Sequence, residues 1–348
     1  MIYRVIFMCL LICTAIVNTA FAEEVKETQQ KSDKQSINTV YDLPAYGEQD
    51  VLMVGEMAQH FVGPQDTLHD IARHYGLGFI ELRAANPGVD SWAPRPETSL
   101  IIPGQHLLPR APQDGIVINL AEMRLYYFKD GLGKPPLTYP LGIGRDGLET
   151  PLGDTTIVRR ATNPNWYPTD RMKEENPNLP WKVEPGPANP LGTHALYLGW
   201  PTFLIHGTNK PWGIGRKVSS GCIRMYPKDI ITLFDHAGDG TKVTVVDQPF
   251  KVATLGDALY IEVNPTSSEI SDIEIDGTFF DAGADIPDAL IKVVEKEVEG
   301  HDITIDWEAF KTAFQEKHGY PVKVSKVDVE NVSVQTKKRS QRPKHRYN

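Results

Sequence analysis

Apolar residues between positions 51 and 103 recur first at helical and then at strand spacing. A helix is predicted to begin at Asp66-Thr67 and to end at Gly76, because four apolar residues follow one another at helical intervals. These residues are Leu68, Ile71, Ala72 and Tyr75. A second short helix is predicted over residues 78–85, and a strand over residues 99–102 before Pro103. We therefore expect a small β-α-α-β unit at 51–103.

The segment 115–247 has the alternating pattern of strands, with Gly and Pro between them. Strands are predicted at 116–120, 124–128, 137–142, 155–160, 195–198, 202–206 and 242–246, and one helix at 228–236. Residues 163–191 contain seven prolines and no regular pattern. A loop of this length in a compact domain is usually functional, so we expect a lid or binding wall. Its Trp166, Tyr167 and Trp181 either line a groove or simply pack.

Past residue 247 the pattern predicts a small α+β appendage at 248–330. Strands are expected at 252–253, 260–263 and 273–275, and amphipathic helices at 288–298 and 307–317. Residues 331–348 form a basic tail on an otherwise acidic chain. This tail is either simply solvated or contacts anionic wall or membrane polymers.

The first 22 residues predict that the protein is exported across the inner membrane. One positive charge at Arg4 precedes an apolar run over residues 5–17, and Ala20-Phe21-Ala22 is a typical cleavage site. We expect a signal peptide at 1–22, with an uncleaved anchor as the alternative, and a flexible polar linker at 23–50. The expected location is the periplasm, outside the inner membrane.

Composition and charge reduce the number of functions that the chain could have. The chain has 348 residues, of which 41% are hydrophobic and 23% charged, and its formal net charge is −9. Such a chain is globular and long enough for two or three domains, and its acidity argues against nucleic acid as the main ligand. Of its three cysteines, only Cys222 follows the predicted signal peptide. A lone thiol in an oxidising compartment is either a buried, inert core residue or a nucleophile.

The sequence around Cys222 favours the nucleophile. His206 ends an apolar strand, and Cys222 follows sixteen positions later, directly after Ser219-Ser220-Gly221. A histidine at a strand end can act as the base that a thiol needs near neutral pH. Gly221 lets the backbone turn so that N–H groups can face a developing oxyanion. Arg224 is a permanent cation suited to a carboxylate or to holding the loop.

This segment resembles the L,D-transpeptidase (YkuD) family, whose signature is His-Gly followed by Ser/Thr-x-Gly-Cys-x-Arg/Asn. Ser220 stands where the family commonly has histidine. The resemblance implies a YkuD-type β-sandwich, with Cys222 as nucleophile and His206 as general base and acid. It also implies that the Gly207 carbonyl orients His206 and that Gly221 and Cys222 form the oxyanion hole. Arg224 and Ser219 would bind substrate or support the loop, and no metal or cofactor is implied.

The unit at 51–103 resembles a LysM module, which binds glycans containing N-acetylglucosamine. The resemblance rests on Gly63-x-x-Asp66-Thr67-Leu68, on Asn86-Pro87 and on Leu100-Ile101-Ile102-Pro103. It implies that the protein contacts the glycan strands of peptidoglycan. The alternative is a structural unit without sugar binding.

Together the two resemblances imply a peptidoglycan enzyme. Cys222 would take the acyl group of a tetrapeptide stem as a thioester and pass it to an amine. A second stem as acceptor gives a 3→3 cross-link, and a lysine of an outer-membrane lipoprotein gives an anchored lipoprotein. Two other classes stay open: a hydrolase at the same site, either an L,D-carboxypeptidase or a lipoprotein-releasing amidase, and a non-catalytic wall-binding protein.

Overall fold

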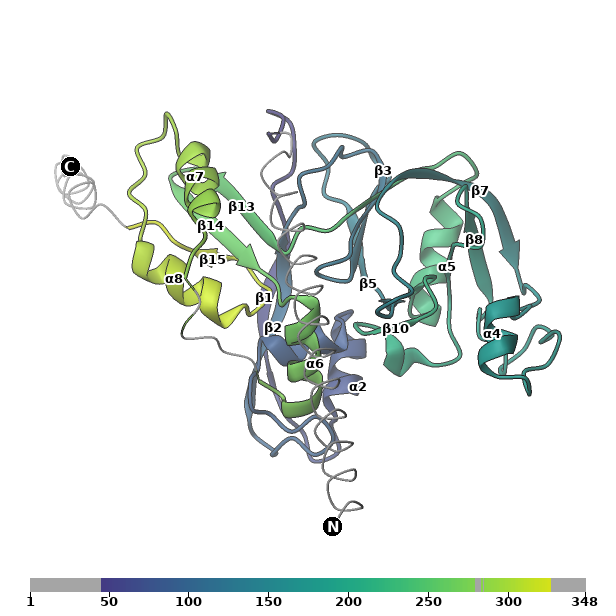
Figure 1. Ribbon diagram of the computed structural model, residues 1–348. Helices are drawn as coiled ribbons and strands as arrows, with labels where there is room; N and C mark the ends of the chain where they lie inside the picture. The colour runs from purple at the N-terminus through teal and green to yellow at the C-terminus, as the bar shows by residue number, and fades with distance from the viewer. Residues whose placement is uncertain (1–44, 279–282, 284, 327–348) are drawn as a thin grey trace, which may run out of the picture.

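A computed structural model describes residues 45–278, 283 and 285–326 (Figure 1). The predicted signal peptide, most of the predicted linker and the basic tail lie outside these residues. Within the described part of the chain, no helix combines the length and apolar character that crossing a membrane requires.

The N-terminal unit has the predicted β-α-α-β order. It comprises β1 (Met53–Phe61), α2 (Leu68–Tyr75), α3 (Phe79–Ala84) and β2 (Ser99–Leu107), and its two strands pair antiparallel along their whole length. The Thr67 side chain caps the start of α2 and Gly76 ends it in the left-handed conformation. Strand β2 continues through Pro103, where the sequence predicted its end. A two-stranded ribbon tolerates this proline because β2 has an unpaired edge.

The central segment forms one eight-stranded sheet in the order β11-β9-β8-β7-β12-β3-β4-β5. The expected β-sandwich is therefore corrected to a single mixed sheet that curls strongly (Figure 1). Strand β12 joins the two halves, because it pairs parallel with β3 and antiparallel with β7. The bounds are β3 (Gly115–Asn119), β4 (Arg124–Phe128), β5 (Leu137–Pro140), β7 (Gly153–Thr162), β8 (His194–Leu198), β9 (Leu204–His206), β11 (Ile223–Arg224) and β12 (Lys242–Val246).

Helix α5 (Pro227–His236) lies within the curl of this sheet (Figure 1). Its Ile230 and Leu233 are fully buried in the same core cluster as residues from both halves of the sheet. The Tyr127 hydroxyl on β4 donates to the His236 carbonyl at 2.8 Å, and the Arg160 guanidinium on β7 donates to the Phe234 carbonyl at 2.9 Å. The two halves of the sheet are thus held to one helix.

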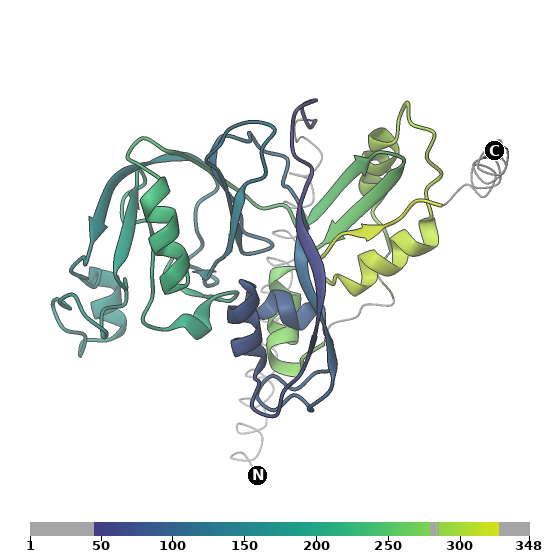
Figure 2. The ribbon, with the colours of Figure 1, turned by 180° about the vertical axis from the view of Figure 1, so that it is seen from behind.

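The proline-rich stretch at 163–191 is an ordered loop beside the ends of β7 and β8. It contains the short helix α4 (Asp170–Glu175), which Figures 1 and 2 both place at this end of the sheet. Asn189 is completely buried, and its amide donates to the Pro164 carbonyl at 2.8 Å while its oxygen accepts from the Leu191 amide at 2.8 Å. The Asn189 side chain therefore links the beginning of the loop to its end.

A second, two-stranded sheet lies next to the main one. It pairs β6 (Ile143–Gly144) parallel with β10 (Lys217–Ser219), and the one-turn 3-10 helix η1 (Pro211–Gly213) precedes β10. The sheet brings the segment before Cys222 against the end of β5.

The C-terminal part is α+β, as predicted. Helices α7 (Asp288–Glu297) and α8 (Trp307–Glu316) pack on a three-stranded sheet of β13 (Phe250–Leu255), β14 (Ala258–Val263) and β15 (Val322–Lys323). The predicted strand at 273–275 is wrong, because these residues lie in α6 (Ser267–Asp276). Thr266 and Glu269 form a capping box, and Ile270 and Ile273 share one helix face buried in the main core.

The N-terminal unit shares the core of the central domain. Buried residues of α2, α3 and β2 belong to one cluster with those of the large sheet and of α6. Backbone bonds add to this contact, because the Phe79 and Ile80 amides donate to the Ile214 and Gly215 carbonyls at 3.3 and 3.2 Å. The connection between the two is short, because β2 ends at Leu107 and β3 already starts at Gly115.

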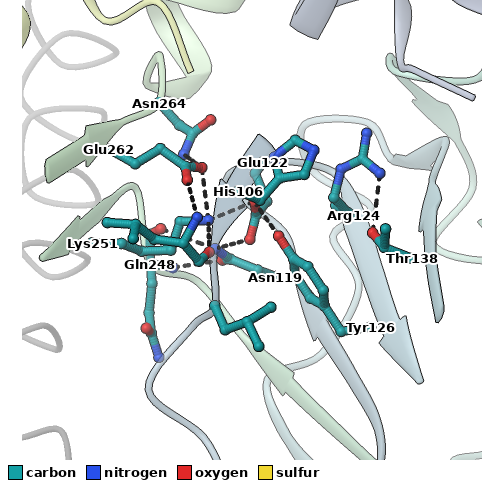
Figure 3. A network of polar contacts seen from close by, with 12 residues as sticks. His106, Asn119, Glu122, Arg124, Tyr126, Thr138, Gln248, Lys251, Glu262 and Asn264 are labelled. Atoms are coloured by element: carbon teal, nitrogen blue, oxygen red, sulfur yellow. Dashed lines mark hydrogen bonds and ion pairs between the residues drawn. The ribbon is translucent and has the colours of Figure 1, made fainter. Parts of the chain in front are cut away.

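A buried charged cluster joins the three parts (Figure 3). Lys251 of β13 is fully buried, and its ammonium lies 2.7 Å from the carboxylates of both Glu122, beside β4, and Glu262 of β14. Glu262 also accepts from the Leu107 amide of β2 at 2.7 Å, and Glu122 from the Tyr126 hydroxyl at 2.8 Å. The ammonium is therefore the counter-charge for two desolvated carboxylates at the point where the three parts meet.

Replacing Lys251 by methionine is expected to lower the free energy of unfolding by about 3–5 kcal/mol, because two buried carboxylates lose their cation. Urea denaturation measures this change. The matched control is Lys292→Met on the exposed face of α7, which should change stability by less than about 0.5 kcal/mol. Equal stability of the two variants would contradict a structural role for the cluster.

Candidate active site

Strand β9 presents His206 at one end of the curled sheet. β9 lies between β8 and β11, so that His206 pairs with Ala195 on one side and with Arg224 on the other. The preceding Ile205 is fully buried in the core, and His206 itself is only 4% exposed. The backbone that carries the imidazole is therefore held between two neighbouring strands.

The imidazole is oriented by the next residue in the chain. His206 Nδ1 lies 2.6 Å from the Gly207 carbonyl oxygen. A carbonyl can only accept, so the proton resides on Nδ1 and the lone pair on Nε2. Burial, reinforced by the Arg224 charge, lowers the pKa of His206 to about 4, although the Gly207 and Leu191 carbonyls oppose the shift. His206 is thus a neutral base at pH 7.

Cys222 follows a strained turn that requires glycine. Gly221 has φ +99°, and a Cβ at this position would lie 2.9 Å from Cε1 of Phe203. Two side chains hold the turn: the Thr150 hydroxyl donates to the Gly221 carbonyl at 2.8 Å, and the Ser219 hydroxyl donates to the Cys222 carbonyl at 2.5 Å. Ser219 therefore supports the loop, one of the two roles expected for it.

The Cys222 thiol is protonated at rest. Burial raises its pKa above the ordinary value, and the Leu204 amide and the Arg224 charge only partly oppose this. The thiol donates to the Thr202 carbonyl at 3.4 Å. The pair is therefore a neutral thiol and a neutral imidazole, and the thiol must rotate from Thr202 before it can give its proton to His206.

Two backbone donors are free beside the sulfur. Among the described residues, neither the Gly221 nor the Cys222 N–H group has a hydrogen-bond acceptor. Free N–H groups of this kind can receive the negative oxygen of a tetrahedral intermediate. The turn thus combines a thiol with the donors that acyl transfer requires.

A pocket of about 470 Å³ brings the candidate residues together. Cys222, His206, Arg224 and Ser219 all line it, together with the loop at 163–191. The loop contributes Pro164, Asn165, Trp166, Tyr167, Thr169, Met172, Pro190 and Leu191. The expected binding wall is confirmed for Trp166 and Tyr167, whereas Trp181 does not line the pocket and is 71% exposed.

Sequence reasoning missed several residues of this pocket. Arg159 and Tyr197 line it from β7 and β8, with the guanidinium carbon 3.4 Å from the tyrosine ring centre. Thr202 accepts the thiol hydrogen bond, and its φ is +71°. Sequence reasoning also missed Thr150, which does not line the pocket but donates to the Gly221 carbonyl of the catalytic turn.

One group of potential metal ligands lies away from this pocket. His106, Glu122 and Glu262 place ligand atoms within 4.8 Å of one another. The Lys251 ammonium lies 2.7 Å from both carboxylates and supplies the positive charge that a metal ion would bring. The donor set is therefore better explained as an ion cluster than as a metal centre.

The family model and two sequence relatives agree on the family to which this chain is similar. The YkuD family model, described as the L,D-transpeptidase catalytic domain, matches residues 113–245. "Probable L,D-transpeptidase YcfS" of Escherichia coli K12 is 44% identical over 243 residues, covering 67% of this chain and 75% of that protein. "Probable L,D-transpeptidase ErfK/SrfK" of Salmonella typhimurium is 36% identical over 299 residues, covering 83% and 92%. The crystal structure of the Enterococcus faecium L,D-transpeptidase C442S mutant aligns with 16% identity and a TM-score of 0.30, covering 51% of this chain and 80% of that one.

Proposed function

Because the chain belongs to the YkuD family of L,D-transpeptidases, enzymes acting on peptidoglycan, we propose that it transfers the acyl group of a tetrapeptide stem through a thioester on Cys222. The observation that carries this proposal is the arrangement at one pocket. The Cys222 thiol, the buried neutral His206 and two free N–H groups on the same turn meet there.

The first half-reaction forms the thioester. The Cys222 sulfur attacks the carbonyl carbon of the third stem residue, and His206 Nε2 takes the thiol proton. The Gly221 and Cys222 N–H groups receive the negative oxygen. When the bond to the terminal D-alanine breaks, His206 returns the proton to the leaving amine.

The second half-reaction resolves the thioester. An acceptor amine attacks the same carbonyl carbon, His206 takes its proton, and the sulfur leaves as the thiol. An amine on the diamino acid of a second stem gives a 3→3 cross-link, whereas a lipoprotein lysine gives an anchored lipoprotein. The cations Arg224 and Arg159 in the pocket suit the carboxylates of a stem peptide.

We also propose that the enzyme is periplasmic and that its LysM-like unit at 51–103 holds the glycan strands while the pocket acts on the stems. The β-α-α-β order of this unit and its resemblance to LysM modules in sequence support the glycan-binding role.

The test is mass analysis of products formed from purified disaccharide-tetrapeptides. We expect a cross-linked dimer that has lost one D-alanine, and no product with Cys222→Ala. Tripeptide and free D-alanine alone would contradict the transferase and establish hydrolysis at the same site. Adding a lysine-ended peptide as second acceptor separates the cross-linking and anchoring outcomes.

A further inference from the structure

Arg159 reaches the catalytic pocket because strand β7 contains one extra residue. Ile157 pairs with Leu198 of β8 in the hydrophobic core. Two positions later Arg159 pairs with Tyr197, only one position along β8, and this pair lines the pocket. In a regular strand, positions 157 and 159 would face the same side of the sheet. The irregularity therefore turns Arg159 from the core side to the pocket side, as β-bulges beside active sites do.

The Arg159 guanidinium lies over an aromatic ring and has no acidic neighbour in the pocket. Its central carbon lies 3.4 Å from the centre of the Tyr197 ring, a cation–π contact. Among the described residues that line the pocket, Arg159 and Arg224 are cations and none is acidic. Arg159 is also exposed. The pocket therefore offers this guanidinium to a negatively charged group of a ligand.

The sheet defines how far Arg159 is from the reacting sulfur. The Leu204 amide of β9 bonds to the Cys222 sulfur, and Leu204 pairs with Tyr197. Arg159, Tyr197 and Leu204 thus form one row across three neighbouring strands, which are about 4.8 Å apart. A guanidinium over Tyr197 is therefore roughly 5–10 Å from the sulfur, beyond the reach of the reacting atoms.

We propose that Arg159 is a specificity-determining residue that binds the side-chain carboxylate of the diamino acid in the donor stem, the stem whose acyl group is transferred. The proposal rests on the function proposed above. In diaminopimelate this carboxylate is six bonds from the carbonyl carbon that Cys222 attacks, roughly 7 Å in an extended chain. The carboxylate of the terminal D-alanine is only three bonds from the same carbon, roughly 3.5 Å. The position of Arg159 matches the more distant carboxylate.

This contact would select between stems. Lysine differs from diaminopimelate by lacking this one carboxylate, so Arg159 favours a diaminopimelate stem over a lysine stem. The planar guanidinium can bind both oxygens of a carboxylate. Tyr197 is a positioning residue for it, because a guanidinium already held on a ring loses less freedom when the ligand binds.

The experiment measures the binding of two free tetrapeptides that differ only in the third residue, diaminopimelate or lysine. Isothermal calorimetry with the full chain carrying Cys222→Ala gives dissociation constants without turnover. We expect the diaminopimelate peptide to bind about fivefold or more tightly, and Arg159→Gln to remove this preference. Tyr197→Ala should reduce the preference about twofold, and Tyr197→Phe should retain it. The matched control is Arg95→Gln, which removes an exposed arginine that does not line the pocket and should change neither constant.

Steady-state kinetics with the catalytic cysteine present gives a second measurement. Arg159→Gln should raise KM for the diaminopimelate stem and leave kcat unchanged, because the guanidinium does not contact the reacting atoms. Two results would overturn the proposal: equal binding of the two peptides before Arg159 is changed, or a preference that survives Arg159→Gln. Product formation reports on the proposed function separately. If the unaltered chain forms no product but Arg159 sets the preference in binding, the transferase proposal fails and the carboxylate site stands.

Discussion

Cys222→Ala is expected to abolish turnover and to abolish acylation by a carbapenem, the largest effect of any substitution considered. The reason is that the thioester forms on this sulfur, and alanine offers no nucleophile to the same pocket. Intact mass after incubation with ertapenem measures the result: one adduct on the unaltered chain and none on the variant.

The matched control is His194→Ala, whose side chain contacts Phe234 and does not line the pocket. It should form the single adduct as the unaltered chain does. An adduct on Cys222→Ala would show that another group is acylated and would remove Cys222 from the mechanism.

His206→Ala is expected to lower turnover by roughly 10²–10⁴-fold, because the neutral thiol then has no base to take its proton. Steady-state kinetics at pH 7 measures the loss, and circular dichroism checks that the variant is folded. The matched control is His194→Ala on the neighbouring β8, whose imidazole contacts Phe234 and does not line the pocket.

His206 also determines how far the pH can fall before the acylation rate decreases. The ordinary histidine pKa is about 6.5, and that of His206 is lowered to about 4, so its neutral form persists well below pH 6.5. The acylation rate should therefore remain near its neutral value at pH 5.5 and fall only as the pH approaches 4. A fall centred near pH 6.5 would contradict the neutral, buried imidazole, as would full turnover by a folded His206→Ala variant.

Local sequence patterns were sufficient to predict most strands of the central domain. Alternating apolar residues predicted the strands that contain His206 and the hairpin of β3 and β4, because each strand buries one face and is punctuated by Gly or Pro. The resemblance implied that His206 and Cys222 act together, and both side chains line one pocket. The short run Ile273-Glu274-Ile275 misled because its alternation also fits one helix face, and the cap that decides between them lies at Thr266.

Contacts between distant segments could not be predicted. The sequence predicted a small unit at 51–103 but no contact between it and the central domain, whereas the Phe79 and Ile80 amides bond to the backbone at Ile214 and Gly215. Such bonds involve main-chain atoms, which carry no residue-specific pattern. The sandwich expectation failed for a similar reason, because the sheet stays continuous only through the pairing of β12 with β3 and β7. Arg159 and Tyr197 meet across two strands, and nothing local marks either as a pocket residue.

The group that orients His206 is a peptide carbonyl and belongs to the adjacent residue. In a triad that uses an aspartate for this purpose, a single codon change can replace the orienting carboxylate and leave the histidine in the wrong tautomer. Here every substitution at position 207 retains the carbonyl, so this interaction has no side chain that mutation can remove. What limits position 207 is the size of the side chain, because a Cβ there would lie 3.1 Å from Ile230 Cγ2 and 3.3 Å from the Leu191 carbonyl oxygen. Side-chain substitution can therefore remove the nucleophile at Cys222 or the base at His206, but it cannot remove the group that orients the base.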